Sequence, residues 1–359
     1  MIKIVAKNEI SGWKGNALRV VAVVAALVAS AIIMAFMGYN PFTVYSKILK
    51  GSVGSAYALK STVNKAIPLA TLSLGTAAAF RMKFWNIGGE GQFYIGAVGA
   101  TAIALSMSNL PAPILLSLMF IVGAILGGLY AMIPAVLKAK WDSSETLVTL
   151  MLNYVAQKFV SYLQYGPWKD PSVNGFPKIA KFSANASLPR LFGCHIGWII
   201  VIVLAVLLWI LFKKTKLGYE IDVIGESRTT AKYAGIHVNK VMFIAVMISG
   251  GLCGVAGMMQ ASGIEHSLTD QLSGGLGFTA VITTWLAKLN PIVAVVVSFV
   301  FSMLIQGGMN LQIAMKIPAA MAQIIQGIII FFVLGSEFFL RYKFVITSNK
   351  KSQPTQEAN

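Results

Sequence analysis

Residues Ile196 to Phe212 read IGWIIVIVLAVLLWILF, a run with no charged side chain. A helix needs about 20 mostly apolar residues to cross the hydrocarbon core of a bilayer. Similar apolar stretches recur along the chain, in which 57% of the 359 residues are hydrophobic and only 11% are charged. A soluble domain carries about 25% charged residues. The sequence therefore predicts an all-α fold, a polytopic transmembrane helix bundle.

The apolar stretches predict about ten spans, or eight at the least, in one transmembrane domain over residues 17–340. The predicted spans are residues 17–37, 62–80, 91–107, 113–137, 146–165, 196–212, 241–262, 274–286, 291–312 and 318–340. The first is longer than the core of a signal peptide and lacks a clear cleavage site, so we expect it to be retained.

The segments outside the spans are assigned to the cytoplasmic or the external side of the membrane. Residues 1–16 are predicted as a cytoplasmic N-terminal segment, 166–195 as a proline-rich external loop and 213–240 as a charged cytoplasmic connection. Residues 341–359 are predicted as a polar, disordered cytoplasmic tail.

The basic residues indicate the orientation. The formal net charge is +17, and with both termini in the cytoplasm about 19 of the 29 Lys and Arg residues lie inside and about 9 outside. Basic residues are enriched in cytoplasmic loops. A nucleic-acid partner is disfavoured, because no basic stripe with interleaved aromatic residues occurs outside the apolar segments.

Motifs for catalysis are missing from the sequence. It contains no G-x-x-x-x-G-K-[ST] phosphate loop. His195, His237 and His266 are far apart and form neither a metal-ligand spacing nor a pairing with a nucleophile. We therefore expect no enzymatic activity, no metal site and no cofactor in this chain.

The first polar interruption is residues 84–93, FWNIGGEGQF, between two apolar stretches. Unpaired polar groups are costly at membrane depth and usually face protein or a water-filled cavity. Asn86, Glu90 and Gln92 are therefore candidates for a translocation path, and Gly88, Gly89 and Gly91 for a flexible bend. The alternative is a structural helix break in which Glu90 caps the helix that follows.

The second interruption is the charged connection from Gly218 to Ile236. Ser227 is suited to begin a short helix, and Gly235 to end it. A short, partly apolar helix on the cytoplasmic side has no membrane to bury into, so another protein is its natural partner. A solvated loop helix is the alternative.

The third interruption, from Gly250 to Pro291, combines polar side chains with a glycine cluster. Discontinuous helices of this kind form substrate sites or gates in transporters, and a structural re-entrant turn fits the same pattern. Gln260 is a candidate path residue. Gly250, Gly254 and Gly257 have the spacing that permits close helix packing and are also candidate hinges.

These segments carry a family resemblance. Residues 86–92, NIGGEGQ, resemble the NIG-x-EGQ signature of ABC transporter permeases of the branched-chain amino acid and simple-sugar group, in particular its nucleoside subfamily. Residues 145–154, ETLVTLMLNY, resemble a helix of that subfamily. Residues 225–236 resemble its coupling segment, although Glu226, Ser227 and Thr230 depart from the usual pattern. Residues 277–291 resemble its GF-x-A … LN-P stretch, with departures at Trp285 and Lys288.

The resemblance implies the membrane-spanning half of an ABC importer in the cytoplasmic membrane. It implies a second, identical or related permease subunit, a cytoplasmic ATPase that uses the ATP, and an extracytoplasmic substrate-binding protein. The ATPase is expected on the coupling segment, at Gly225, Arg228, Ala231, Tyr233, Ala234 and Gly235. A neutral, hydrogen-bonding substrate suits a path through Asn86, Glu90, Gln92, Asn153 and Gln260.

Other functions remain open on the sequence. The expected substrate is a nucleoside, with ribose or another simple sugar as the alternative. An ion-gradient-driven transporter would use Glu90 and Lys158 as ion-linked groups. A non-transporting membrane scaffold or sensor is a third possibility.

Overall fold

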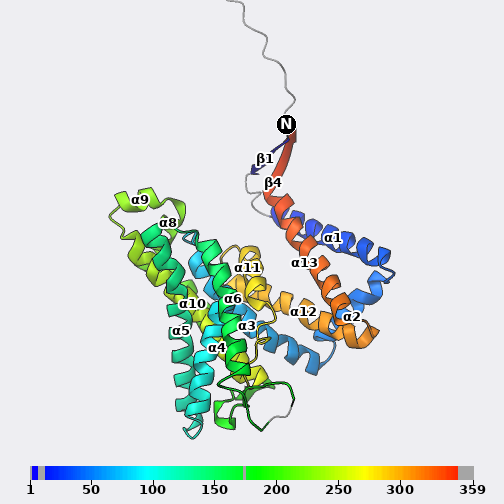
Figure 1. The fold of residues 1–359 in the computed structure, drawn as a ribbon. Helices are drawn as coiled ribbons and strands as arrows, with labels where there is room; N and C mark the ends of the chain where they lie inside the picture. The colour runs from blue at the N-terminus through cyan, green and yellow to red at the C-terminus, as the bar shows by residue number, and fades with distance from the viewer. Residues whose placement is uncertain (1, 7–12, 173–174, 347–359) are drawn as a thin grey trace, which may run out of the picture. The chain divides into compact units, whose positions relative to one another are not determined.

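Figure 1 shows a computed structural model that describes residues 2–6, 13–172 and 175–346. The chain forms two compact units, one of residues 1–47 with 308–359 and one of residues 48–307. Its longer helices are α1 (Trp13–Phe36), α3 (Ala56–Phe80), α4 (Gly89–Ser106), α5 (Ala112–Trp141), α6 (Glu145–Tyr165), α7 (Gly197–Lys214), α10 (Val238–Gln260), α12 (Pro291–Met315) and α13 (Ala319–Arg341). The shorter ones are α2 (Pro41–Val53), α8 (Lys216–Glu226), α9 (Arg228–Tyr233), α11 (Leu276–Leu286), η1 (Ala184–Ala186) and the π-turn η2 (Ala261–Glu265).

Helix α10 is the centre of the larger unit, where it packs against α3, α4 and α5. Glycines permit this packing: a Cβ on Gly254 would lie 2.2 Å from the carbonyl oxygen of Gly123, and one on Gly257 would lie 2.0 Å from that of Phe93. Backbones that approach so closely are typical of helix packing in lipid. By contrast, α5 and α7 expose many of their apolar side chains, as a lipid-facing surface requires.

In the described residues, four helices are long and apolar enough to cross a membrane: α5, α7, α10 together with η2, and α12. A fifth is possible if α1 and α2, which meet at a bend of 115°, form one broken span. Helices α3, α4 and α6 have 25, 18 and 21 residues but are more polar. The chain is thus a multi-pass helical bundle, and ten spans remain a prediction.

Loops from distant parts of the sequence meet at the two ends of the larger unit. At one end, Arg81 after α3 pairs with Asp222 of α8. At the other end, the Phe182 N–H donates to the carbonyl of His266, and the His195 N–H donates to Asn64 Oδ1. The segment predicted as the external loop, residues 166–195, therefore lies at the end opposite α8 and α9 (Figure 1). It contains the short strands β2 (Arg190–Leu191) and β3 (Cys194–His195).

The predicted span over residues 274–286 differs from a full helix. The helix there, α11, has 11 residues, which rise about 16 Å, roughly half of the ~30 Å hydrocarbon core. An irregular loop, residues 266–275, precedes α11. His266 lies at the external-loop end, and Lys288, after α11, lines the same cavity as Arg81. A sequence pattern cannot show this loop, since the loop has no periodicity. The membrane crossing predicted here stays a prediction.

The smaller unit contains a two-stranded antiparallel sheet in which β1 (Ile2–Ala6) pairs with β4 (Tyr342–Ile346). Two short sheets therefore qualify the all-α prediction. The disordered tail predicted for residues 341–359 instead begins with the end of α13 and a strand. The rest of that predicted tail, residues 347–359, lies outside the described residues.

Candidate functional site

The turn between α3 and α4 is held by a buried carboxamide pair. Asn86 Nδ2 donates to Gln92 Oε1 at 3.1 Å, and Gln92 Nε2 donates back to Asn86 Oδ1 at 2.9 Å. Asn86 also donates to Ser249 Oγ on α10 and accepts from the Gly88 N–H. Both side chains are almost fully buried, so their hydrogen bonds are used within the protein.

Asn153 of α6 holds the same turn from the other side. Its Oδ1 accepts from the Gly91 N–H at 2.8 Å, and its Nδ2 donates to the Ile87 carbonyl at 2.9 Å. Three predicted path residues, Asn86, Gln92 and Asn153, are thus brought together. They satisfy backbone groups of a bend that would otherwise be unpaired at membrane depth.

Glu90 belongs to a different contact. Its Oε2 accepts from the Gly277 N–H at 2.7 Å, in the first turn of α11. The carboxylate therefore caps α11, whose N-terminus carries a partial positive charge, although the sequence alternative placed this cap on the following helix. A Cβ on Gly277 would lie 2.5 Å from the Glu90 backbone nitrogen, so only glycine permits this approach.

Side chains of α4 and α6 satisfy the irregular loop before α11. Tyr94 Oη donates to the Asp270 carbonyl at 2.8 Å, and Gln157 Nε2 donates to the same oxygen at 3.2 Å. The Asp270 N–H donates to Gln164 Oε1 at 3.1 Å. The sequence reading missed Tyr94, Gln157 and Gln164. The signal was available: polar residues recur on α6 at positions 153, 157, 161 and 164, one face of a helix.

Gln260 lies apart from that network, at the end of α10, where the helix passes into η2. It is 9% exposed, and its Oε1 has no hydrogen-bond partner in the described part of the chain. A buried acceptor without a partner is costly. Of the five predicted path residues, Gln260 is the one with a buried, unpartnered side-chain acceptor among the described residues.

The predicted hinge glycines are packed tightly. Gly250 faces Ala131, Gly254 faces Gly123 and Gly257 faces Phe93, each at a distance that excludes a Cβ. Around the turn, a Cβ on Gly91 would lie 3.0 Å from Asn153 Oδ1 and one on Gly88 3.0 Å from Asn86 Oδ1, whereas Gly89 has more room. Close packing is thus enough to explain why glycine occupies these positions. That they act as hinges remains a prediction.

The predicted coupling segment is α8 followed by α9, and its residues divide into two sets. Gly225 and Ala231 are buried, and a Cβ on Gly225 would lie 2.1 Å from the Arg81 carbonyl oxygen. The exposed set is Arg228, Tyr233, Ala234 and Gly235. Tyr233 is 90% exposed, and Ser227 caps α9 by accepting from the Thr230 N–H. The first set anchors the segment, and the second presents a surface.

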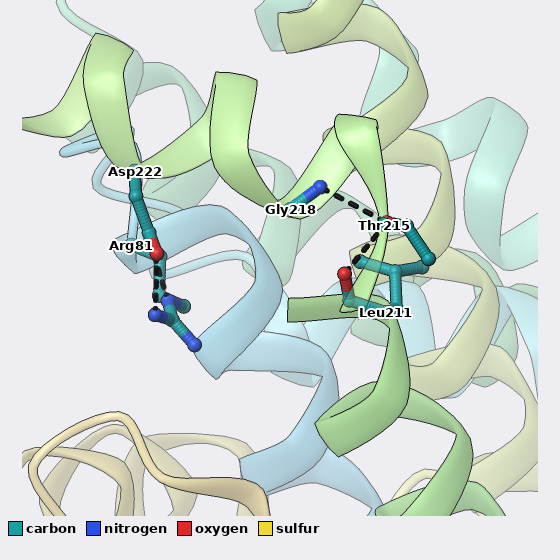
Figure 2. Close-up of polar contacts among 5 residues, drawn as sticks. All are labelled: Arg81, Leu211, Thr215, Gly218 and Asp222. Atoms are coloured by element: carbon teal, nitrogen blue, oxygen red, sulfur yellow. Dashed lines mark hydrogen bonds and ion pairs between the residues drawn. The ribbon is translucent and has the colours of Figure 1, made fainter. Parts of the chain in front are cut away.

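Two polar ties fix α8 to the membrane helices (Figure 2). Arg81 holds Asp222 through two hydrogen bonds of 2.8 Å, from Nε to Oδ1 and from Nη2 to Oδ2. Thr215 Oγ1 donates to the Leu211 carbonyl of α7 at 2.6 Å and accepts from the Gly218 N–H of α8 at 3.2 Å. The Thr215 tie is local, because its two bonds span four and three positions. The Arg81–Asp222 pair does not follow from local sequence, because its residues are 141 positions apart.

A multi-pass helical bundle with a buried polar bend between α3 and α4 and an irregular loop before α11 has features typical of membrane transport proteins. The chain belongs to the family described as the permease component of the branched-chain amino acid transport system, whose model matches residues 58–334. It is a transport component rather than an enzyme, which confirms the prediction of a permease.

Similar proteins cover nearly the whole chain. A glucose ABC transporter permease protein of Haloferax volcanii is 30% identical over 96% of this chain and 94% of its own length. A guanosine ABC transporter permease protein of Bacillus subtilis is 30% identical over 88% of this chain and 92% of its own. A nucleoside ABC transporter permease protein of Lactococcus lactis is 29% identical over 87% and 89%, respectively.

Proposed function

We propose that this chain is the membrane-spanning subunit of an ATP-driven importer that carries nucleosides across the cytoplasmic membrane. Two similar proteins are named as guanosine and nucleoside permeases, and each aligns with nearly the whole chain. Neutral carboxamides recur in the α3–α4 bend and on α4, α6 and α10: Asn86, Gln92, Asn153, Gln164 and Gln260 are buried, and Gln157 is half-buried. Such groups suit a neutral substrate with several hydroxyl and ring-nitrogen groups.

A simple sugar is the second candidate substrate. The glucose permease of Haloferax volcanii is as similar as the guanosine permease and covers more of this chain, 96% against 88%. Glucose and the ribose part of a nucleoside are both polyhydroxylated and neutral. The two candidates differ in the base, which offers an aromatic face to stack.

The coupling surface is the observation that carries the proposal. Gly225 and Ala231 anchor α8 and α9, while Tyr233 and Arg228 are exposed. Exposed tyrosine and arginine side chains are enriched at protein interfaces. We assign this surface to a cytoplasmic ATPase, which binds and hydrolyses the ATP, so that the chain itself needs no cofactor.

The remaining partners follow from the same proposal. A second permease subunit, identical or related, completes the translocation path, and an extracytoplasmic binding protein delivers the substrate. The basic end of the bundle, with Arg81 and the α8–α9 surface, is then the cytoplasmic end. The loop of residues 166–195 faces the binding protein.

Within the path, we assign direct substrate contact to Gln260. Its unpartnered oxygen accepts a hydroxyl or amine proton of the substrate, whereas Asn86, Gln92 and Asn153 hold the bend between α3 and α4. Glu90 supports the gate by holding α11. Gly88, Gly89 and Gly91 on one side and Gly250, Gly254 and Gly257 on the other are the positions where the wall flexes.

Uptake of labelled guanosine by cells that lack the gene, with and without complementation, tests the substrate. Complementation-dependent uptake that excess ribose and glucose do not compete supports nucleoside import. Competition by either sugar, or uptake of that sugar alone, moves the assignment to the second candidate. Depleting ATP while the proton gradient is kept should stop uptake. If uptake stops only when the gradient collapses, the ion-driven alternative holds.

A further inference from the structure

A cavity of about 710 Å³ lies beside the Arg81–Asp222 pair, between the ends of α3, α7, α8 and α11. Aromatic rings form much of its wall. Trp85 and Trp285 stack with ring centroids 5.3 Å apart, and Phe80 packs against both. Trp209 and Phe212 of α7 also line it. None of the exposed residues of the coupling segment, Arg228, Tyr233, Ala234 and Gly235, lines it.

The charge in the cavity is positive. Arg81, Lys83, Lys213 and Lys288 line it, against the carboxylates of Asp222 and Glu226. Because Arg81 and Asp222 neutralise one another, the exposed pair Lys83 and Lys213 outnumbers the carboxylate of Glu226. Lys83 and Lys213 are exposed, so both can reach an anion that enters from outside. The cavity therefore favours a ligand with a phosphate or another anionic group.

The cavity also lies at the edge of the apolar outer surface. Helix α7 carries exposed Val203, Leu207 and Ile210 on the length that leads away from the cavity. Helix α12 begins at Pro291 in the cavity wall and continues with exposed Ile292 and Val296. A ligand with a charged head and long apolar tails matches both features. Tryptophan is also enriched where membrane meets water, and basic pockets between helices on the cytoplasmic side bind lipid head groups.

We propose that this cavity binds the phosphate head group of an anionic phospholipid, with the acyl chains along α7 and α12. The head group touches the wall formed by Asp222, Gly225 and Glu226 of α8. A bound lipid therefore stabilises the position of the coupling segment. This inference does not depend on which substrate the protein carries.

The test is native mass spectrometry of the full-length protein in detergent, titrated with phosphatidylglycerol and with phosphatidylcholine of the same chains. Each lysine near an anionic lipid surface contributes about fivefold to affinity, so Lys83→Gln with Lys213→Gln should weaken phosphatidylglycerol binding by tenfold or more. The matched control is Lys140→Gln with Lys214→Gln. It removes the same charge from exposed lysines outside the cavity wall and should change binding less than twofold.

Several outcomes would overturn the proposal. Equal losses in both double variants would mean general surface attraction, and equal binding of phosphatidylcholine would mean an apolar groove. Displacement of the lipid by glycerol 3-phosphate at the same concentration would mean a soluble phosphate site. Unchanged lipid binding with weakened ATPase binding in the cavity variant would assign the surface to the ATPase.

A second measurement needs no variant. The chain has 7 tryptophans, and Trp85, Trp209 and Trp285 line the cavity. Phosphatidylglycerol with brominated chains should quench tryptophan fluorescence more than brominated phosphatidylcholine at the same mole fraction. Equal quenching by the two lipids would refute the head-group preference even if the lysine variants fail to fold.

Discussion

Arg81, just after α3, and Asp222, in the middle of α8, form a two-pronged pair in which Nε donates to Oδ1 and Nη2 to Oδ2, both at 2.8 Å. The guanidinium carbon also lies 4.3 Å from the centre of the Phe212 ring of α7. One side chain thus joins three helices. A bidentate arginine restricts orientation as well as distance, so α8 moves together with the end of α3.

Replacing Arg81 with Gln should therefore weaken the link between the coupling segment and the path. Asp222 is 44% exposed at its side chain, so water replaces part of what is lost, and we expect a stability loss of only about 1 kcal/mol. Uptake should fall several-fold while the amount of protein in the membrane stays similar. ATPase activity measured in the same vesicles should fall less than uptake does.

The reversed pair, Arg81→Asp with Asp222→Arg, is the control for that prediction. Partial recovery of uptake relative to either single variant would show that the contact itself matters. If uptake by the Arg81→Gln variant is unchanged, Gly225 and Thr215 hold α8 in place without the ion pair.

Replacing Gly257 with Ala should destabilise the larger unit. The new Cβ would lie 2.0 Å from the Phe93 carbonyl oxygen, so α10 and α4 must separate, and overpacking of this kind costs about 1 to 3 kcal/mol. Gly327→Ala is the control, because nothing lies within 4 Å of its Cβ position. A melting temperature in detergent that falls equally for both variants, or for neither, would contradict close packing at Gly257.

Sequence patterns predicted the elements whose causes are local. The apolar run of residues 196–212 became α7, and the Ser227 and Gly235 signals bounded α9. The contacts that organise the bend are not local. Asn153 reaches Ile87 and Gly91 across 66 and 62 positions, and Glu90 reaches Gly277 across 187. The sequence indicates that polar side chains within apolar segments need hydrogen-bond partners, but it does not indicate which residues those partners are.

The coupling segment shows the same limit at single residues. Ala231 and Tyr233 are two positions apart and looked equivalent as surface residues, yet Ala231 is fully buried and Tyr233 is 90% exposed. A short helix of six residues gives too few turns for periodicity to indicate which side is buried.

This difference changes the design of a docking test. Tyr233→Ala removes an exposed ring, so we expect uptake and ATPase binding to fall while the melting temperature stays within about 1 °C, since exposed substitutions change stability by less than about 0.5 kcal/mol. Ala231→Glu buries a carboxylate and should lower the melting temperature instead. Co-purification of the ATPase with each variant, together with the two melting curves, separates docking from folding. Normal co-purification with Tyr233→Ala would remove Tyr233 from the interface.

The buried imidazole of His195 predicts a dependence of stability on pH. Burial lowers the pKa of His195 to about 4, and the nearby charges of Arg190 and His266 act in the same direction, whereas a free imidazole has a pKa near 6.5. The unfolded chain therefore binds the proton more tightly, and stability is complete above about pH 6.5 and is lost as pH falls towards 4. We expect a lower melting temperature at pH 5 than at pH 7.5.

Two variants check the source of that pH effect. His195→Phe should remove most of the difference between pH 7.5 and pH 5, because it has no proton to bind. His237→Gln, which changes an exposed imidazole, should keep it. A wild-type protein equally stable at both values would show that His195 does not titrate in this range.

Gln260 gives the most direct test of the substrate path. Its buried Oε1 has no partner in the described residues, so Gln260→Leu should leave the fold intact or slightly more stable. If that oxygen accepts a hydrogen bond from the substrate, about 1 kcal/mol of binding is lost, and the KM for uptake should rise about fivefold. Gln92→Leu is the comparison, because it breaks the pair with Asn86 and should lower the melting temperature. A KM unchanged in Gln260→Leu would exclude Gln260 from substrate contact, since no structural role would hide the loss.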